Sequence, residues 1–255
     1  MARIVGLWCV WLVCFSAVAE PNASSDPINL YFTGRPPFIW RDDAGQMHGI
    51  SYEIGEQVFQ RAQIPYQWIK APSARVNHYF ITDKQRLCLV NWIYTDERQK
   101  LGRISLPTYQ EQDYVGVVPK EKADKYRGRE IAAVLDDPTT IVLFKEGYAY
   151  STVLTKLLIN MKAPKVDYRG TQTHNLRLIA EKRADIAFFE QQELALILQQ
   201  QPDLGDKVAV VNFPGLNTEP TTRHVICSKS VTEQEMQKIN LAIEALQLTR
   251  LSQGN

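Results

Sequence analysis

The sequence predicts an α/β protein of two lobes, each a sheet flanked by helices, that captures a small molecule between the lobes. Short apolar runs alternate with segments of helical apolar spacing along the chain, and this alternation occurs in two successive blocks. Such alternation is typical of sheets whose parallel strands are joined by helices. The length of 255 residues is sufficient for two lobes of about a hundred residues each.

The first block contains three predicted strands and two predicted helices. Its first helix starts near Ser51, because Ile54 and Val58 recur at helical spacing, and Pro65 ends it. The second helix runs from Ser73 to about Thr82. The predicted strands are Asn29–Thr33, Tyr66–Ile69 and Leu87–Trp92.

The second block repeats this arrangement, and the chain then returns to the first lobe. We expect crossings between lobes at Pro107–Gln112 and Phe213–Thr222, which places 26–110 and 220–255 in lobe 1 and 111–219 in lobe 2. A final helix from Thr232, its N-cap, to Leu248 follows the last strand. The predicted strands are Tyr114–Pro119, Ile131–Leu135, Ile141–Phe144, Lys165–Tyr168, Asp185–Phe189, Val208–Asn212 and Arg223–Cys227; the helices are Tyr148–Met161, Leu176–Lys182 and Gln192–Gln200.

The first nineteen residues have the pattern of a cleaved secretory signal peptide. Arg3 is the lone charge before an apolar run from Ile4 to Phe15, and Ala17-Val18-Ala19 is a small-x-small cleavage site. The alternative is an uncleaved amphipathic helix. Since Val13 rather than a small residue precedes Cys14, we expect no lipid anchor, and we expect the protein in the periplasm.

Charge and cysteine content narrow the classes of partner. Without Arg3 the chain has 28 basic and 28 acidic residues, so nucleic acid and anionic membrane surfaces are not expected partners. Cys88 and Cys227 each lie in a strand-like run and can pair in an oxidising compartment, or remain as buried free thiols. The four histidines show no ligand spacing, so we expect no metal site.

The chain resembles type 2 periplasmic solute-binding proteins of the amino-acid-binding (family 3) class, which serve ABC transporters. The resemblance covers nearly all of the chain after the leader and rests on the order and spacing of several motifs. They are Pro37-Phe38 after the first strand, Gly49-Ile50-Ser51-Tyr52-Glu53-Ile54, Thr95-Asp96-Glu97-Arg98, Ile104 to Tyr109, Lys182-Arg183-Ala184-Asp185 through Glu190, Val225–Lys229 and Lys238 to Ile243. It implies a Venus-flytrap fold of two lobes, each a mixed sheet flanked by helices, with a cleft between the lobes that closes around a ligand without chemistry.

The two main candidate ligand-binding residues are Arg98 and Glu190. A guanidinium presents a planar fork that grips a carboxylate, and the resemblance places the family's carboxylate-binding arginine at Arg98. The alternative is a surface arginine paired with Glu97 or Asp96. Glu190 matches the place of an acid that holds a ligand ammonium; the alternative is an acid near a helix N-terminus.

Further candidates lie at ends of predicted strands. Asn91 and Trp92 end the third strand, where open α/β sheets bind ligands. Gly147 and Tyr148 occupy a strand-to-helix junction whose amides can bind an anion; an ordinary tight turn is the alternative. Phe38 and Arg75 complete the candidate site, with a core or rim aromatic and a solvated surface arginine as their alternatives.

Phe32 and Ile93 stand where relatives often carry polar groups that bind an ammonium. The possible ligands therefore include amino acids, dicarboxylates, small peptides and opines. We expect a monomer without cofactor that captures a small carboxylate-bearing ligand for an ABC permease or a membrane sensor. No nucleophile elbow, metalloprotease or phosphate-loop motif indicates an enzyme. Two rivals remain: a cyclohexadienyl-dehydratase-like enzyme that uses Glu190 as acid or base, and a protein with a lost site that acts through protein contacts.

Overall fold

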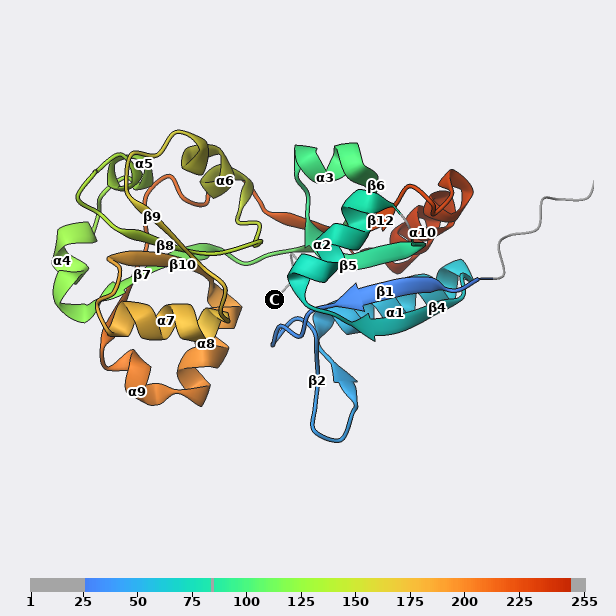
Figure 1. Ribbon diagram of the computed structural model, residues 1–255, viewed down its shortest axis with the longest axis horizontal. Helices are drawn as coiled ribbons and strands as arrows, with labels where there is room; N and C mark the ends of the chain where they lie inside the picture. The colour runs from blue at the N-terminus through green and yellow to red at the C-terminus, as the bar shows by residue number, and fades with distance from the viewer. Residues whose placement is uncertain (1–25, 84, 249–255) are drawn as a thin grey trace, which may run out of the picture.

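A computed structural model describes residues 26–83 and 85–248 as two α/β lobes that lie side by side (Figure 1). Each lobe contains one five-stranded sheet with helices packed on it. The predicted two-lobed α/β class, with a mixed sheet in each lobe, is confirmed. The predicted signal peptide lies outside the described residues. No helix of the described ranges is long and apolar enough to cross a bilayer.

The first sheet combines strands from both ends of the chain. Its strands are β1 (Ile28–Phe32), β4 (Tyr66–Lys70), β5 (Leu87–Ile93), β6 (Gly102–Gln110) and β12 (Thr222–Ser228), and its helices are α1 (Ile50–Ala62), α2 (Ser73–Thr82), α3 (Asp96–Leu101) and α10 (Glu233–Leu246). The order is β4-β1-β5-β12-β6. β1 runs parallel to β4 and β5, whereas β12 is antiparallel to β5 and β6. A short hairpin, β2 (Trp40–Arg41) and β3 (Met47–His48), projects beside this lobe (Figure 1).

The second sheet uses one continuous stretch of chain. Its strands are β7 (Tyr114–Pro119), β8 (Val142–Lys145), β9 (Lys165–Tyr168), β10 (Ile186–Glu190) and β11 (Val208–Val211). They are ordered β11-β7-β10-β8-β9, and β7 is antiparallel to β10 and β11. Its helical segments are η1 (Lys120–Lys122), α4 (Ala123–Tyr126), α5 (Ile131–Leu135), α6 (Thr152–Ile159), α7 (Gln172–Ala180), α8 (Gln191–Gln200) and α9 (Pro202–Gly205).

The predicted strand over Ile131–Leu135 is wrong, because this segment is the helix α5. Ile131, Val134 and Leu135 are buried, while Ala132 and Ala133 are exposed. The buried positions follow helical spacing, but the all-apolar composition of the run concealed that period.

The predicted crossing at Pro107–Gln112 is also partly wrong, since β6 extends to Gln110. Its ladder with β12 runs from Thr222 opposite Gln110 to Ser228 opposite Gly102. The register shifts next to the pair His224 and Pro107. A shift in register accommodates a proline, which has no N–H to donate to the ladder.

A disulfide and a capped helix hold the returning segment in the first lobe. Cys88 of β5 and Cys227 of β12 are directly opposite and bonded, with a sequence separation of 139. Thr232 is the N-cap of α10 and forms a capping box with Glu235, so the predicted cap is confirmed. The C-terminal segment therefore completes the first lobe, as predicted.

Two chain crossings join the lobes. They are the segments between β6 and β7 and between β11 and β12, and both run through the space between the sheets (Figure 1). The Glu111 amide donates to the carbonyl oxygen of Thr221 over 2.9 Å, which holds the two crossings side by side.

Candidate ligand-binding site

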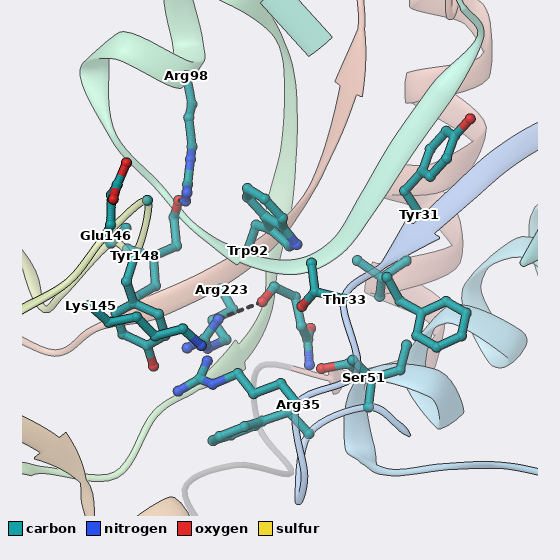
Figure 2. A pocket seen from close by; sticks show the side chains of 18 residues that line it. Tyr31, Thr33, Arg35, Ser51, Trp92, Arg98, Lys145, Glu146, Tyr148 and Arg223 are labelled. Atoms are coloured by element: carbon teal, nitrogen blue, oxygen red, sulfur yellow. Dashed lines mark hydrogen bonds between the residues drawn. The ribbon is translucent and has the colours of Figure 1, made fainter. Parts of the chain in front are cut away.

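A cavity of about 90 Å³ lies between the lobes (Figure 2). Most of its lining comes from ends of strands in the first lobe, and the second lobe contributes the loop between β8 and α6. The lining comprises residues 31–33, 90–93 and 145–149, with Arg35, Phe38, Ile39, Ser51, Arg98 and Arg223. Both Phe32 and Ile93 are in this set, so part of the wall is apolar.

Asn91 at the end of β5 presents an unused donor in this cavity. Its backbone is left-handed (φ 56°), a conformation that asparagine tolerates better than most residues, and it is 2% exposed. The side-chain oxygen Oδ1 accepts from Oγ1 of Thr108 over 2.7 Å, and the backbone oxygen accepts from Nη1 of Arg223 over 2.7 Å. Nδ2 has no partner among the described residues. A buried amide donor without an acceptor is costly.

Arg98 enters the cavity from α3. Thr95 is the N-cap of this helix, and its Oγ1 accepts from the Arg98 amide over 3.2 Å. The Arg98 guanidinium donates to the carbonyl oxygen of Ile93 over 2.7 Å and lies 4.5 Å from the centre of the Trp92 ring.

Arg98 forms no ion pair within the described part of the chain, so the alternative pairing with Glu97 or Asp96 is absent. Burial, and secondarily the positive charge of Arg223, lower the pKa of Arg98 to about 10. Burial thus disfavours the charged guanidinium, and the Glu97 charge and the Ile93 carbonyl offset this effect only in part. A carboxylate is the group that would compensate it.

Lys145 is a second cation in the cavity without an ion pair among the described residues. It ends β8 and is half-buried, and its Nζ lies 5.5 Å from the centre of the Tyr148 ring. Burial lowers its pKa, against the opposing effect of the nearby Glu193 charge. The sequence prediction included the strand-to-helix junction that contains Lys145 but assigned the anion contact to its amides alone.

Arg35, in contrast, already has a partner, and that partner comes from the other lobe. Its Nε and Nη2 donate to Oε1 and Oε2 of Glu193 over 2.9 and 2.8 Å. The guanidinium lies between two rings, 4.3 Å from that of Phe38 and 4.5 Å from that of Tyr148. A backbone hydrogen bond fixes the position of Phe38, because its carbonyl oxygen accepts from the Ser51 amide at the start of α1 over 2.9 Å. Arg35 was not predicted as a site residue, although it follows the end of β1.

Arg223 is likewise paired. Its Nε donates to Oε1 of Glu111 over 2.7 Å, Nη2 contacts the same oxygen, and both side chains are buried. Burial lowers its pKa, but the charges of Glu111 and Tyr114 outweigh this effect and raise the pKa overall. This pair lies where the crossings meet, so it fixes the wall of the cavity. Arg223 was not predicted as a site residue either, because nothing in the sequence of its strand indicates that a buried acid contacts it.

The structure places most of the predicted site residues together, with two exceptions. Glu190 is fully buried, and its Oε2 caps α8 by accepting from the Glu193 amide over 2.9 Å. Burial raises its pKa, and its Oε1 has no partner among the described residues. Arg75 is exposed on α2, and neither residue lines the cavity. The predicted residues that do line it are Phe38, Asn91, Trp92, Arg98, Gly147 and Tyr148.

Several solved structures share this fold at low sequence identity. An ancestral arginine-binding protein bound to arginine matches with TM-score 0.68 and 15% identity over 89% of this chain and 95% of its own. The amino acid ABC transporter substrate-binding protein from Streptococcus pneumoniae bound to L-arginine matches with TM-score 0.67 and 16% identity over 89% and 92%. An ancestral amino acid-binding protein, a precursor of cyclohexadienyl dehydratase, matches with TM-score 0.66 and 16% identity over 89% and 94%.

Sequence comparison identifies the family itself. No curated protein matches the chain closely. The profile of the bacterial extracellular solute-binding proteins, family 3, matches residues 30–250 and so covers both lobes and both crossings. The fold and the cavity between lobes agree with this match. The chain belongs to the bacterial extracellular solute-binding proteins, family 3.

Proposed function

We propose that the protein is a monomeric periplasmic receptor that captures a small carboxylate-bearing ligand between its lobes. It is exported by the signal peptide at 1–19 and presents its ligand-bound form to an ABC permease or a membrane sensor. The observation that carries this proposal is Arg98, a desolvated cation without a carboxylate partner in the described chain, in a cavity shared by two lobes.

Three groups form the proposed carboxylate site. The guanidinium of Arg98 supplies a charged fork, which binds a carboxylate more strongly than a neutral donor does. Asn91 offers its unused Nδ2, and the ring of Trp92 covers the guanidinium. Because these groups are buried or partly buried, a ligand carboxylate gains more from them than it would at an exposed surface.

Closure of the lobes is the proposed signal. The lobes, 26–110 with 220–255 and 111–219, are connected by two crossings, and such connections act as hinges in two-lobed proteins. A ligand held by Arg98 on one lobe and by the loop at 145–149 on the other would bind the closed form better. It would shift the equilibrium toward closure by this difference in affinity.

The structural relatives support an amino acid or a related compound as the ligand. Two of those described above are bound to arginine. This amino acid has the carboxylate that the Arg98 site would bind. The relatives differ from this chain at more than four positions in five, so they support the ligand class and not a particular side chain.

A binding screen with the Arg98→Ala variant tests this proposal. The purified protein is screened by thermal shift against amino acids, organic acids and short peptides, where a ligand at a hundred times its Kd stabilises by about 2.7 kcal/mol. We expect the wild-type protein to bind a ligand that is recovered chemically unchanged. Arg98→Ala should lose at least about a hundredfold in affinity, since a charged hydrogen-bonding group is removed.

The matched control is Arg61→Ala, which removes an exposed arginine at the end of α1. It should bind as wild type does, and circular dichroism should show both variants folded. Unchanged affinity in Arg98→Ala would contradict the site. Turnover of a cyclic carboxylate such as prephenate or arogenate would show that the protein is a dehydratase-like enzyme and not a receptor.

A further inference from the structure

The cavity holds more positive charge than the chain itself neutralises. Four basic side chains line it, and Figure 2 shows them entering from both lobes. Arg35 is neutralised by Glu193 and Arg223 by Glu111. Arg98 and Lys145 have no acidic partner within residues 26–83 and 85–248. Two buried or half-buried cations therefore remain for a ligand to neutralise.

The acid in the cavity lining and the acids that bind its arginines are already paired. Glu193 and Glu111 bind the two arginines, and Glu146, the only acid in the described cavity lining, pairs with Arg169 through a contact of 2.6 Å at the surface. Glu190 is not part of the lining; its Oε2 caps α8, and its Oε1 has no partner among the described residues. No acid in the described cavity lining is thus left without an ion pair to hold a ligand ammonium.

The place that a cationic ligand group would take is already filled by Arg35. Two facing aromatic rings and a carboxylate make a favourable environment for a guanidinium or an ammonium. Phe38, Tyr148 and Glu193 form such an environment, and the Arg35 guanidinium occupies it with both carboxylate oxygens bound. A ligand with a basic side chain would have to displace this ion pair.

We propose that the ligand is a small dicarboxylate, with one carboxylate on Arg98 and the other on Lys145. This inference rests on the proposed function and narrows its ligand class. Arg98 comes from the first lobe and Lys145 from the second, so a compound with a carboxylate at each end would bridge the lobes. Each cation would regain the stabilisation that burial removed.

The cavity suits a short ligand. It has about 90 Å³ of space for water-sized groups, well above the roughly 10–15 Å³ that a single water molecule needs, so it can hold several such groups. A short dicarboxylate such as succinate or glutarate is of this kind. L-Arginine is larger, and it has two positive groups for which the described cavity offers no free acid.

Isothermal titration calorimetry with matched ligands tests the inference. The panel contains malonate, succinate, glutarate and adipate, the monocarboxylates butyrate and valerate, and L-glutamate, L-arginine and L-lysine. We expect succinate or glutarate to bind at least about tenfold tighter than the monocarboxylate of equal length. Glutarate should also bind tighter than L-glutamate, because the ammonium of L-glutamate finds no free acid.

Variants of Lys145 identify the second contact. Lys145→Gln should weaken dicarboxylate binding at least about tenfold and leave valerate binding unchanged, whereas Lys145→Arg should keep the dicarboxylate preference. The control is Lys162→Gln, an exposed lysine of the same lobe that pairs with Asp136, and it should bind as wild type does. Thermal melting of each variant shows whether it is folded.

Three results would overturn the inference. The first is binding of L-arginine or L-lysine as tight as that of the best dicarboxylate. The second is no dicarboxylate binding at all, and the third is an unchanged dicarboxylate preference in Lys145→Gln. If an amino acid binds and Arg98→Ala abolishes that binding, the proposed function stands and only the dicarboxylate is wrong. If no ligand of the wider screen binds, both are wrong.

Discussion

Two ends of the same cavity contain arginines in opposite situations. Arg35 is held by both carboxylate oxygens of Glu193 and lies between two aromatic rings. Arg98 also lies over an aromatic ring, but within residues 26–83 and 85–248 its guanidinium donates only to the Ile93 carbonyl. Residue type and aromatic contact are thus shared. The presence or absence of an acid from the chain itself separates an arginine that maintains structure from one that is available to a ligand.

This difference has an energetic consequence. Removing one member of a buried ion pair leaves the other charge without compensation, which is costly. Removing a desolvated cation that has no partner relieves a cost instead. Substitution at the Arg35 end should therefore destabilise the protein, whereas substitution at the Arg98 end should weaken ligand binding without lowering stability.

The largest expected effect is that of Arg35→Ala. The side chains of Arg35 and Glu193 are 13% and 3% exposed, so the variant leaves a buried carboxylate unpaired and should lose about 3 kcal/mol of unfolding free energy. Urea denaturation measures this loss. Arg41→Ala is the control, because Arg41 is exposed and lies 5.8 Å from the Phe32 ring, and it should cost less than about 1 kcal/mol.

A double-mutant cycle sharpens this result. Arg35→Ala and Glu193→Ala should each destabilise the protein, and the double variant should lose clearly less than the sum of the two. L-Arginine should also stabilise Arg35→Ala more than it stabilises wild type, since its guanidinium can enter the vacated place. Additive losses, or a stable Arg35→Ala, would show that the pair does not hold the lobes.

Removing the disulfide should also cause a large loss of stability. It joins β5, which carries Asn91 and Trp92, to β12, which carries Arg223, across 139 residues of sequence. Cys88→Ser with Cys227→Ser should cost about 2–5 kcal/mol, because the unfolded chain is no longer cross-linked. The ligand preference should persist, since both strands remain in one hydrogen-bonded sheet. Unreduced, unfolded wild type should show no free thiol at these positions; two titratable thiols would contradict the bond.

The smallest expected effect is the response of affinity to pH. The pKa of Arg98 is lowered to about 10 by burial, and the pKa of Lys145 is lowered by the same cause. A bound anion favours the charged forms, so affinity should be constant from pH 6 to 8 and fall as pH rises through 10. Titrations at half-unit steps measure this fall, with circular dichroism as the check on folding. In Lys145→Gln, any fall in ligand affinity near pH 10 comes from deprotonation of Arg98. A ligand affinity that rises near pH 10 would contradict the assignment.

The lowered pKa of Arg98 also predicts how the stability of the ligand-free protein depends on pH. A cation whose pKa is lowered on folding destabilises the protein fully below that pKa, and the penalty shrinks as pH rises from the folded-state pKa toward the unfolded-state pKa. Arg98→Met should therefore melt at a higher temperature than wild type at pH 7. Its advantage should shrink above pH 10. A lower melting temperature at pH 7 would show that Arg98 contributes to the structure as Arg35 does.

Sequence could predict the part of the site that depends on local order. Asn91 and Trp92 lie at the end of one strand and Arg98 follows it, and topology places such ends at a binding edge. The functions of Arg35 and Arg223 depend on acids 158 and 112 residues away, which no local pattern indicates.

The same limit explains the errors in the fold. Helix α5 was taken for a strand because every residue in it is apolar, and only burial by the rest of the lobe reveals its helical face. The extent of β6 depends on pairing with β12, more than a hundred residues later. The lobes and the chain order were predictable from periodicity, whereas the pairing of distant segments required the structure.

The most direct test of the difference between the two arginines is a ¹H–¹⁵N NMR titration of the arginine Nε–H groups with glutarate. The signals are assigned with Arg98→Lys and Arg35→Lys. We predict a saturable shift of the Arg98 signal with slower exchange with water, at the Kd that calorimetry gives, while the Arg35 signal shows no such gain in protection. A titration in which Arg35 responds and Arg98 does not would contradict the account.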